Sequence, residues 1–363
     1  MPDQVWHDEG GMMADTSDTD DWADALTGPK KKPMRRGTKI FLWVFTALVA
    51  WLTLSNASWL APDPAGKPKL IAHRGVYHLY DKRAAIGRDT CTARYVYPPT
   101  HEVFENTAES MRWAVGLGAN MVEVDVAPTK DGRMVLFHDW TVDCRTNGRG
   151  ETRDLTLAEL KALDIGYGYT ADGGKTFPLR GKGVGKMPTV EEGLAALPVH
   201  PILFNFKSRN PQEADQLFAI LKASGRDSAK IGDAFYGGAR PVKRMRQLLP
   251  NNWSFDLKTE AKACTKDYVK YGWTGIIPES CRNGVIAIPV NYQWAFWGWP
   301  DRLIQRMDSV GARIIVFGPY ESGKSNEGLT TPQQLAKVPA SFNGYIWVED
   351  IRAVGPALRP RQK

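Results

Sequence analysis

The chain has 363 residues, of which 43% are hydrophobic, and its formal net charge is +7. This length allows one large domain of barrel size or two smaller ones, and the apolar content is ordinary for a globular core. Outside residues 30–39 the basic residues are dispersed rather than clustered, so the positive charge does not favour a nucleic-acid-binding protein.

The first 39 residues are predicted to be a disordered cytoplasmic tail. Residues 1–29 carry eight acidic residues and no Lys or Arg, whereas residues 30–39 carry six basic residues and no acidic one. Few apolar residues interrupt the acidic part, so it cannot bury enough surface to offset the entropy lost on ordering.

Residues 40–61 contain no charged side chain and are predicted to form a single transmembrane helix. The preceding basic cluster keeps the N-terminus cytoplasmic, so everything after the helix is expected to be periplasmic or otherwise extracytoplasmic. A cleaved signal peptide is the alternative, because residues 55–57 resemble a cleavage site, but the region before residue 40 is longer than in an ordinary signal. Residues 62–68 form a short Pro/Gly linker.

All four cysteines follow the predicted membrane span, and the first lies in a long polar and aromatic insertion at 76–104. An even number of cysteines on the oxidising side suggests two disulfides, for which three pairings are possible. We favour Cys91 with Cys144 and Cys264 with Cys281. Zinc binding is the alternative, although no Cys-x-x-Cys spacing supports it.

From residue 69 onwards, patterns typical of strands and helices alternate. Strands are predicted at 69–72, 121–126, 134–137, 201–207, 230–236, 252–256, 284–290, 312–317 and 344–348. Helices are predicted at 107–117, 156–163, 190–197, 211–224, 241–249, 260–271, 300–310 and 332–337. This alternation predicts an α/β fold with a parallel sheet, closed into an irregular TIM (β/α)8 barrel over residues 69–363. Nine strands are predicted where a regular barrel has eight. We expect the pair 121–126 and 134–137 to account for the extra strand.

Two carboxylates lie on one face of the predicted strand 121–126. Glu123 and Asp125 alternate with apolar residues, and neighbouring carboxylates repel each other unless a cation or a basic side chain lies between them. His138 ends the next strand and is expected close by. Carboxylate oxygens suit Mg²⁺ or Ca²⁺, so the pattern predicts a metal site, with a solvated strand face as the alternative.

Five motifs occur in order along the chain. They are His73-Arg74-Gly75, Glu105-Asn106-Thr107, Gly118-Ala119 followed by Glu123-x-Asp125, Thr129-Lys130-Asp131-Gly132, and His138-Asp139. With them the chain resembles the glycerophosphodiester phosphodiesterase family over roughly residues 70–150, and more weakly to about 350. The resemblance implies a somewhat irregular TIM barrel and metal-dependent hydrolysis of glycerophosphodiesters to an alcohol and glycerol phosphate.

The resemblance also implies roles for individual residues. His73 would act as general base and His138 as general acid, while Arg74 and Lys207 neutralise the phosphate oxygens. Glu105 would support the site, or simply pair with Arg74. The divalent cation, Mg²⁺ or Ca²⁺, would be held by Glu123, Asp125 and Asn205.

Asn205 departs from the family pattern, which has a carboxylate at this position. An amide oxygen is a metal ligand without charge, so weaker metal binding, a changed substrate or lost activity is expected. A membrane-anchored barrel that binds phosphodiesters without cleaving them is therefore an alternative function.

Residues 291–299 contain five large aromatic side chains and follow the predicted strand 284–290. Such a group most often packs under a loop, but beside a membrane it could receive an acyl chain, which would make lysophospholipids substrates. A lysophospholipase D or sphingomyelinase D-like phosphodiesterase is thus a further alternative. His78 and His101 are expected on the surface.

Overall fold

The computed structural model describes residues 34–81, 90–322 and 327–358. The chain divides into two compact units, Met1–Trp51 and Leu52–Lys363, which are treated separately here. The predicted acidic tail at 1–29, three of the six basic residues that follow it, and part of the insertion at 76–104 lie outside the described residues.

Among the described residues, one helix is long and apolar enough to cross a membrane. This helix, α2 (Arg36–Ser55), has 20 residues. The apolar pattern predicts a span at 40–61, but the helix ends at Ser55, where the Asn56 side chain donates a hydrogen bond back to the carbonyl of Leu52. A separate short helix, η2 (Ser58–Leu60), follows.

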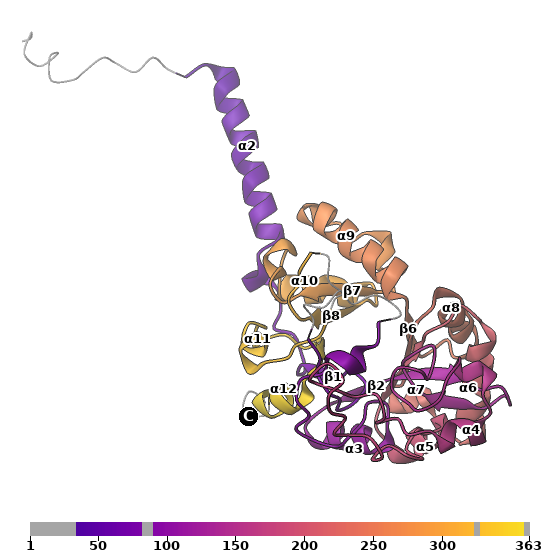
Figure 1. Cartoon of the computed structure of the whole chain (residues 1–363). Helices are drawn as coiled ribbons and strands as arrows, with labels where there is room; N and C mark the ends of the chain where they lie inside the picture. Colours follow the sequence, from indigo (N-terminus) through magenta and orange to yellow (C-terminus); the bar gives the residue numbers. More distant parts are fainter. Residues whose placement is uncertain (1–33, 82–89, 323–326, 359–363) are drawn as a thin grey trace, which may run out of the picture. The chain divides into compact units, whose positions relative to one another are not determined.

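Eight parallel strands form the sheet of the second unit (Figure 1). They are β1 (Lys69–Ala72), β2 (Met121–Pro128), β4 (Ile202–Phe206), β5 (Ala234–Gly237), β6 (Trp253–Phe255), β7 (Val285–Pro289), β8 (Arg313–Phe317) and β9 (Tyr345–Val348). The order β6-β5-β4-β2-β1-β9-β8-β7 places the first and last strands side by side, with Lys69 opposite Tyr345. The sheet is therefore a nearly closed TIM barrel, with β6 and β7 at its two unpaired edges in the described part of the chain.

The ninth strand, β3 (Met134–Leu136), pairs antiparallel with β2, as the sequence pattern predicts. A tight turn joins the two strands: the Thr129 hydroxyl donates to Asp131 at 2.6 Å, and Gly132 has a φ of +76°. The amide of Phe137 then donates to the carbonyl of Asp125 at 3.0 Å. The hairpin thereby brings His138 next to the carboxyl end of β2.

Helices surround the strands of the barrel (Figure 1). They are α3 (Ala108–Gly116), α4 (Leu157–Ala162), α5 (Val190–Ala196), α6 (Gln212–Ala223), α7 (Ser228–Ile231), α8 (Ala239–Leu248), α9 (Lys262–Tyr271), α10 (Asp301–Ser309), α11 (Pro332–Ala336) and α12 (Ile351–Leu358). Threonines 107, 156 and 189 cap three of them, because each hydroxyl accepts a hydrogen bond from a backbone amide of the first turn.

The described residues form three hydrophobic clusters. One of them, which includes Phe104, Phe137 and Tyr169, packs around the hairpin of β2 and β3. The other two follow from the alternation of strand side chains between the two faces of the sheet. One set, including Val122, Val124 and Phe204, packs with the helices. The alternate set, including Met121 and Leu203, packs inside the barrel. Residues 123, 125 and 205 have the same parity as this inner set, so their side chains also belong to the inner face.

Two details differ from the sequence prediction. Strand β5 begins at Ala234 rather than at 230, because Asp227 caps the short helix α7 and Gly232, with φ +92°, ends it. Helix α12 was not predicted.

The disulfides join Cys91 to Cys144 and Cys264 to Cys281, which confirms the favoured pairing.

Candidate active site

The candidate residues gather at the carboxyl ends of neighbouring strands. His73 and Arg74 follow β1, the carboxylate pair lies in β2, and Lys207 follows β4. Strands β1, β2 and β4 are adjacent in the sheet, and Asp125 is directly opposite Asn205. The structure therefore brings together the residues that the sequence motifs single out.

Glu123 is a fully buried carboxylate with two hydrogen-bond donors. The Tyr236 hydroxyl donates to Oε1 at 2.6 Å, and the backbone amide of Arg74 donates to Oε2 at 2.9 Å. Burial and the neighbouring Asp125 carboxylate raise the pKa of Glu123. The surrounding side chains therefore only partly compensate the negative charge of an ionised Glu123.

Asp125 is equally buried but is surrounded by donors. Its Oδ2 accepts from the Asn106 side chain at 3.1 Å, and its Oδ1 accepts from the Asn205 amide nitrogen at 2.7 Å, with Lys207 Nζ at 3.6 Å. Burial alone would raise the pKa of Asp125, but Lys207, His138 and Arg74 outweigh it and lower that pKa well below its ordinary value. Asp125 is therefore the ionised member of the pair.

His73 lies between two carboxylates. Its Nδ1 donates to Glu349 Oε2 at 2.7 Å, and its Nε2 is 3.9 Å from Glu123 Oε2. Burial lowers the pKa of His73, but the charges of Glu349 and Glu123 outweigh burial and Arg74, and the net pKa is raised. The side chain retains 18% of its exposure, so a substrate can reach it.

His138 has the opposite electrostatic environment. Its Nδ1 donates to Asp139 Oδ1 at 2.7 Å. Burial, together with the positive charges of Arg74 and Lys207, lowers the pKa of His138 to about 4. His138 is therefore neutral near pH 7, and 21% of its side chain is exposed.

Arg74 is held by the backbone as well as by its side chain. Its φ is +55°, and its Nη1 donates to Glu105 Oε1 at 3.0 Å. The following residue must be glycine, because Gly75 has a φ of +74° and a Cβ there would lie 2.6 Å from Ser110 Oγ. Arg74 Nε is 3.4 Å from Asp125 Oδ2, so the guanidinium adjoins the carboxylate pair.

Sequence reasoning missed several residues that shape this site. Glu349 accepts hydrogen bonds from His73, the Tyr77 hydroxyl and the backbone amide of Gly328. Its position directly after the last strand could have revealed it, since active sites of barrels lie at the carboxyl ends of strands. Tyr236 and Arg145 gave no comparable signal, because most of their partners are distant in sequence. Asn106 lies in the motif Glu105-Asn106-Thr107, but the motif does not reveal its contact with Asp125.

The prediction that His78 lies on the surface is wrong. Its ring is 5% exposed and stacks on the half-buried ring of His101, with 4.1 Å between the ring centroids. The His78 ring also meets Phe104 and Tyr169 edge-on, and the His101 ring meets Trp113 edge-on. Burial lowers the pKa of His78 to about 3, and the ring is neutral at ordinary pH.

The donor set suits a hard divalent cation at two of the three predicted positions. Glu123 and Asp125 supply carboxylate oxygens on one face, and the raised pKa of Glu123 reflects negative charge that a cation would offset. Asn205 turns its amide nitrogen towards Asp125, and only the reversed amide would present oxygen. No group of three His, Cys, Asp or Glu side chains suited to a metal ion occurs in the described residues.

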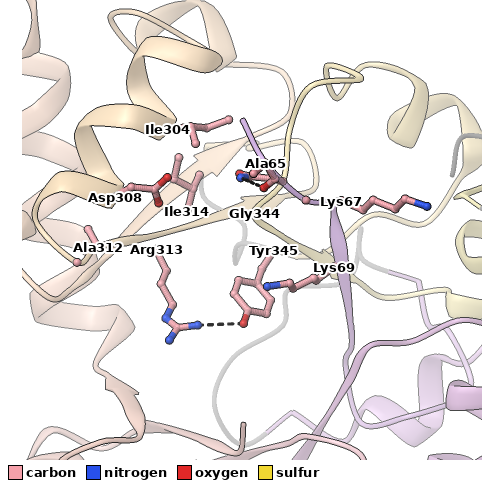
Figure 2. Close-up of a pocket in the computed structure, with 13 residues that line it drawn as sticks. Ala65, Lys67, Lys69, Ile304, Asp308, Ala312, Arg313, Ile314, Gly344 and Tyr345 are labelled. Atoms are coloured by element: carbon pink, nitrogen blue, oxygen red, sulfur yellow. Dashed lines mark hydrogen bonds between the residues drawn. The ribbon is translucent and has the colours of Figure 1, made fainter. Parts of the chain in front are cut away.

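A separate hollow of about 330 Å³ lies at the opposite end of the barrel (Figure 2). Its lining includes Lys69, Arg313 and Tyr345, which begin β1, β8 and β9, and Arg313 donates to the Tyr345 hydroxyl at 3.1 Å. The two histidines and the carboxylate pair do not line it, so this hollow is not part of the candidate active site.

Comparison with known proteins gives a consistent result. The model of the glycerophosphoryl diester phosphodiesterase family matches residues 73–232, a range that includes both histidines and Lys207. A glycerophosphodiester phosphodiesterase of Caldanaerobacter subterraneus is 31% identical over 205 residues, which cover 51% of this chain and 79% of that protein. One from Bacillus subtilis is 36% identical over 144 residues, 39% of each chain.

Solved structures are similar in fold at low sequence identity. A glycerophosphodiester phosphodiesterase of Agrobacterium tumefaciens has a TM-score of 0.51 and 17% identity, covering 80% of this chain and 99% of its own. An Oleispira antarctica phosphodiesterase, solved in complex with the product sn-glycerol-3-phosphate, has a TM-score of 0.51 and 16% identity, covering 81% and 97%.

Proposed function

Because this chain belongs to the glycerophosphoryl diester phosphodiesterase family, we propose that it hydrolyses glycerophosphodiesters to an alcohol and glycerol phosphate by acid–base catalysis between His73 and His138. The proposal is supported by the position of the two histidines beside the buried pair Glu123 and Asp125, and by their pKa values, which are shifted in opposite directions. Such a pair provides one proton donor and one proton acceptor near neutral pH.

The electrostatics support an assignment opposite to that implied by the sequence resemblance. His138 is neutral, so it takes the proton of the glycerol hydroxyl next to the phosphate. The hydroxyl oxygen attacks phosphorus, the bond to the head-group oxygen breaks, and His73 gives its proton to that oxygen. Water then opens the cyclic phosphate with the two roles exchanged, which restores both histidines.

Positive side chains and a divalent cation would offset the charge that builds up on the phosphate. Arg74 adjoins the carboxylate pair, and Lys207, with 25% of its side chain exposed, lies on the β4 side of Asp125. Mg²⁺ or Ca²⁺ held by Glu123 and Asp125, with the Asn205 oxygen as third ligand once that amide is reversed, would polarise the phosphate when bound.

The proposal is tested by incubating the full chain with glycerophosphocholine, with and without EDTA. We expect release of choline and glycerol phosphate that EDTA abolishes and added Mg²⁺ or Ca²⁺ restores. Binding of the diester without product in any metal would instead support the non-catalytic barrel. Activity that persists after complete metal removal would contradict the role given to Glu123 and Asp125.

A second candidate substrate is a lysophospholipid. In residues 291–299, Phe296 is buried, but Trp294 is 80% and Trp297 45% exposed. Trp297 donates to the Val269 carbonyl at 3.3 Å, so this end of the loop lies against α9. Comparing kcat/KM for lysophosphatidylcholine and glycerophosphocholine decides between them: equal values, or a preference for the water-soluble diester, would remove the lipid candidate.

The membrane anchor is also a proposal. Helix α2 has the length and composition of a single membrane span, a basic cluster precedes it, and the two disulfides suit an oxidising compartment. On this basis the N-terminus is cytoplasmic and the barrel is extracytoplasmic.

A further inference from the structure

Arg145 is buried next to the candidate active site, and its guanidinium donates hydrogen bonds to four side chains. Its Nε donates to Asp139 at 2.8 Å, and its Nη1 donates to Glu105 at 3.2 Å and to the Tyr169 hydroxyl at 2.6 Å. Its Nη2 donates to the Thr92 hydroxyl at 2.7 Å. Only 4% of the side chain is exposed, so these contacts are shielded from water.

Two of these contacts lead directly to proposed catalytic groups. Asp139 accepts the Nδ1 proton of His138, and Glu105 accepts from Nη1 of Arg74. One guanidinium therefore contacts both the carboxylate that binds His138 and the carboxylate that binds Arg74. Without it, the buried carboxylate of Glu105 and the half-buried carboxylate of Asp139 would lose their shared positive partner.

The segments that supply these contacts are fastened together around Arg145. Cys91 and Cys144, the immediate neighbours of Thr92 and Arg145, form a disulfide. The amide of Gly168 donates to the carbonyl of Arg145 at 3.2 Å, and the amide of Thr170 donates to the carbonyl of Ala93 at 3.0 Å. The residue between them, Tyr169, is thereby held against the guanidinium.

We propose that Arg145 is a positioning residue that aligns His138 and Arg74 with each other, and that the Cys91–Cys144 disulfide keeps Arg145 in place. On this proposal the disulfide does more than stabilise the insertion, because it also helps to position the side chains of the candidate active site. This inference rests on the proposed function, since alignment has meaning only if the two groups act on one phosphodiester.

The first experiment replaces the guanidinium in the full chain. Arg145→Met keeps most of the buried volume, and Arg145→Lys keeps the charge without the forked set of donors. We expect kcat for glycerophosphocholine to fall about 100-fold in the first variant, as for misplacement of catalytic groups by about 1 Å, with KM changed far less. Removing the guanidinium also takes a positive charge away from Asp139, the partner of His138, so the pKa of His138 should rise and the acidic limb of the pH profile should move to higher pH.

The second experiment compares the two disulfides. Cys91→Ser/Cys144→Ser is predicted to lower kcat about tenfold or more at a temperature where circular dichroism shows a folded chain. The matched control, Cys264→Ser/Cys281→Ser, removes the other disulfide, which joins α9 to the turn before β7. It should lower Tm while leaving kcat and the pH profile unchanged.

Two further measurements keep the inference testable if the disulfide variant fails to fold. Thr92→Val removes only the acceptor of Arg145 Nη2 and should lower kcat several-fold. Adding Thr92→Val to Arg145→Met should cause little further loss, because both changes act through one group. Unchanged kcat in folded Arg145→Met, or losses that multiply in the double variant, would overturn the inference. An inactive unaltered chain would instead contradict the proposed function itself.

Discussion

Asn205 is the proposed metal ligand at which the sequence resemblance leads us to expect a carboxylate instead. The side chain occupies the inner face of β4, directly opposite Asp125, and its amide nitrogen is 2.7 Å from that carboxylate. A third carboxylate would add a charged oxygen ligand where the chain now has a neutral amide.

Replacing Asn205 by Glu is therefore predicted to tighten Mg²⁺ or Ca²⁺ binding by about tenfold, equivalent to about 1.4 kcal/mol. Isothermal titration calorimetry measures the dissociation constant. Gln305→Glu, an equal change of charge at an exposed position on α10, is the control and should leave the constant unchanged. The same constant in Asn205→Glu would show that residue 205 is not a ligand.

The two histidines should respond separately to loss of their carboxylate partners. Glu349 raises the pKa of His73 and Asp139 raises that of His138. A proton donor loses activity above its pKa, so Glu349→Gln should move the alkaline limb of the kcat/KM profile to lower pH. A proton acceptor loses activity below its pKa, so Asp139→Asn should move the acidic limb to lower pH. Shifts of about one pH unit are expected for each.

If the roles are exchanged, Glu349→Gln would move the acidic limb instead, and Asp139→Asn the alkaline limb. Measuring both variants under the same saturating metal concentration distinguishes the two assignments, since each variant then changes one limb only.

The site residues differ in how readily the sequence reveals them. Glu123, Asp125 and His138 sit on recognisable strand patterns joined by a short turn, so their proximity follows from chain connectivity. Glu349 and Tyr236 reach the same site from β9 and β5, and their contacts depend on closure of the barrel. The contacts of Arg145 cannot be predicted from the sequence, because Thr92, Glu105 and Tyr169 come from separate segments that meet only in the folded protein.

At the scale of secondary structure, local signals account for most elements. The hairpin of β2 and β3 and the threonine caps of α3, α4 and α5 depend on residues within a few positions of one another. The start of β5 was predicted too early because an apolar residue in α7, Ile231, reads equally well as strand. The Gly-rich segment at 166–185 gave no prediction, because its structure depends on contacts with distant segments.

Gly168 illustrates such a contact. A Cβ at this position would lie 1.9 Å from the carbonyl oxygen of Cys144, which is backbone and cannot move aside. Gly168→Ala is therefore predicted to lower the free energy of unfolding by about 3 kcal/mol, as overpacking does. Urea denaturation measures it. The control is Gly116→Ala in α3, where a Cβ meets no atom within 4 Å and stability should be unchanged or raised.

A free energy of unfolding equal to that of the unaltered chain in Gly168→Ala would contradict the close approach of residues 168 and 144. The substitution should also reduce kcat if the segment indeed holds Tyr169 against Arg145, which links this stability measurement to the support of the site.

At the scale of the whole molecule, composition separates the polar N-terminus, the apolar helix α2 and the barrel. Alternating strand and helix patterns predict the barrel and its closure, but the strand order and the unpaired edges at β6 and β7 come only from the structure. The proposed membrane insertion depends on α2 and its flanking charges, so it can be tested independently of catalysis.

We predict that the full chain resists extraction by alkaline carbonate and that a variant lacking residues 36–55 does not. Protease added to intact cells or spheroplasts should digest the barrel and leave an N-terminal tag protected. Digestion of the tag with survival of the barrel would reverse the proposed topology, and carbonate extraction of the full chain would remove the anchor.

The central claim is that His73 and His138 together hydrolyse a glycerophosphodiester in the barrel. The most direct measurement is the rate of glycerol phosphate release from glycerophosphocholine by the full chain, compared with folded His73→Ala and His138→Ala variants in saturating Mg²⁺ or Ca²⁺. We expect turnover by the unaltered chain and a loss of at least about 100-fold in each variant. Turnover that survives either substitution would contradict it.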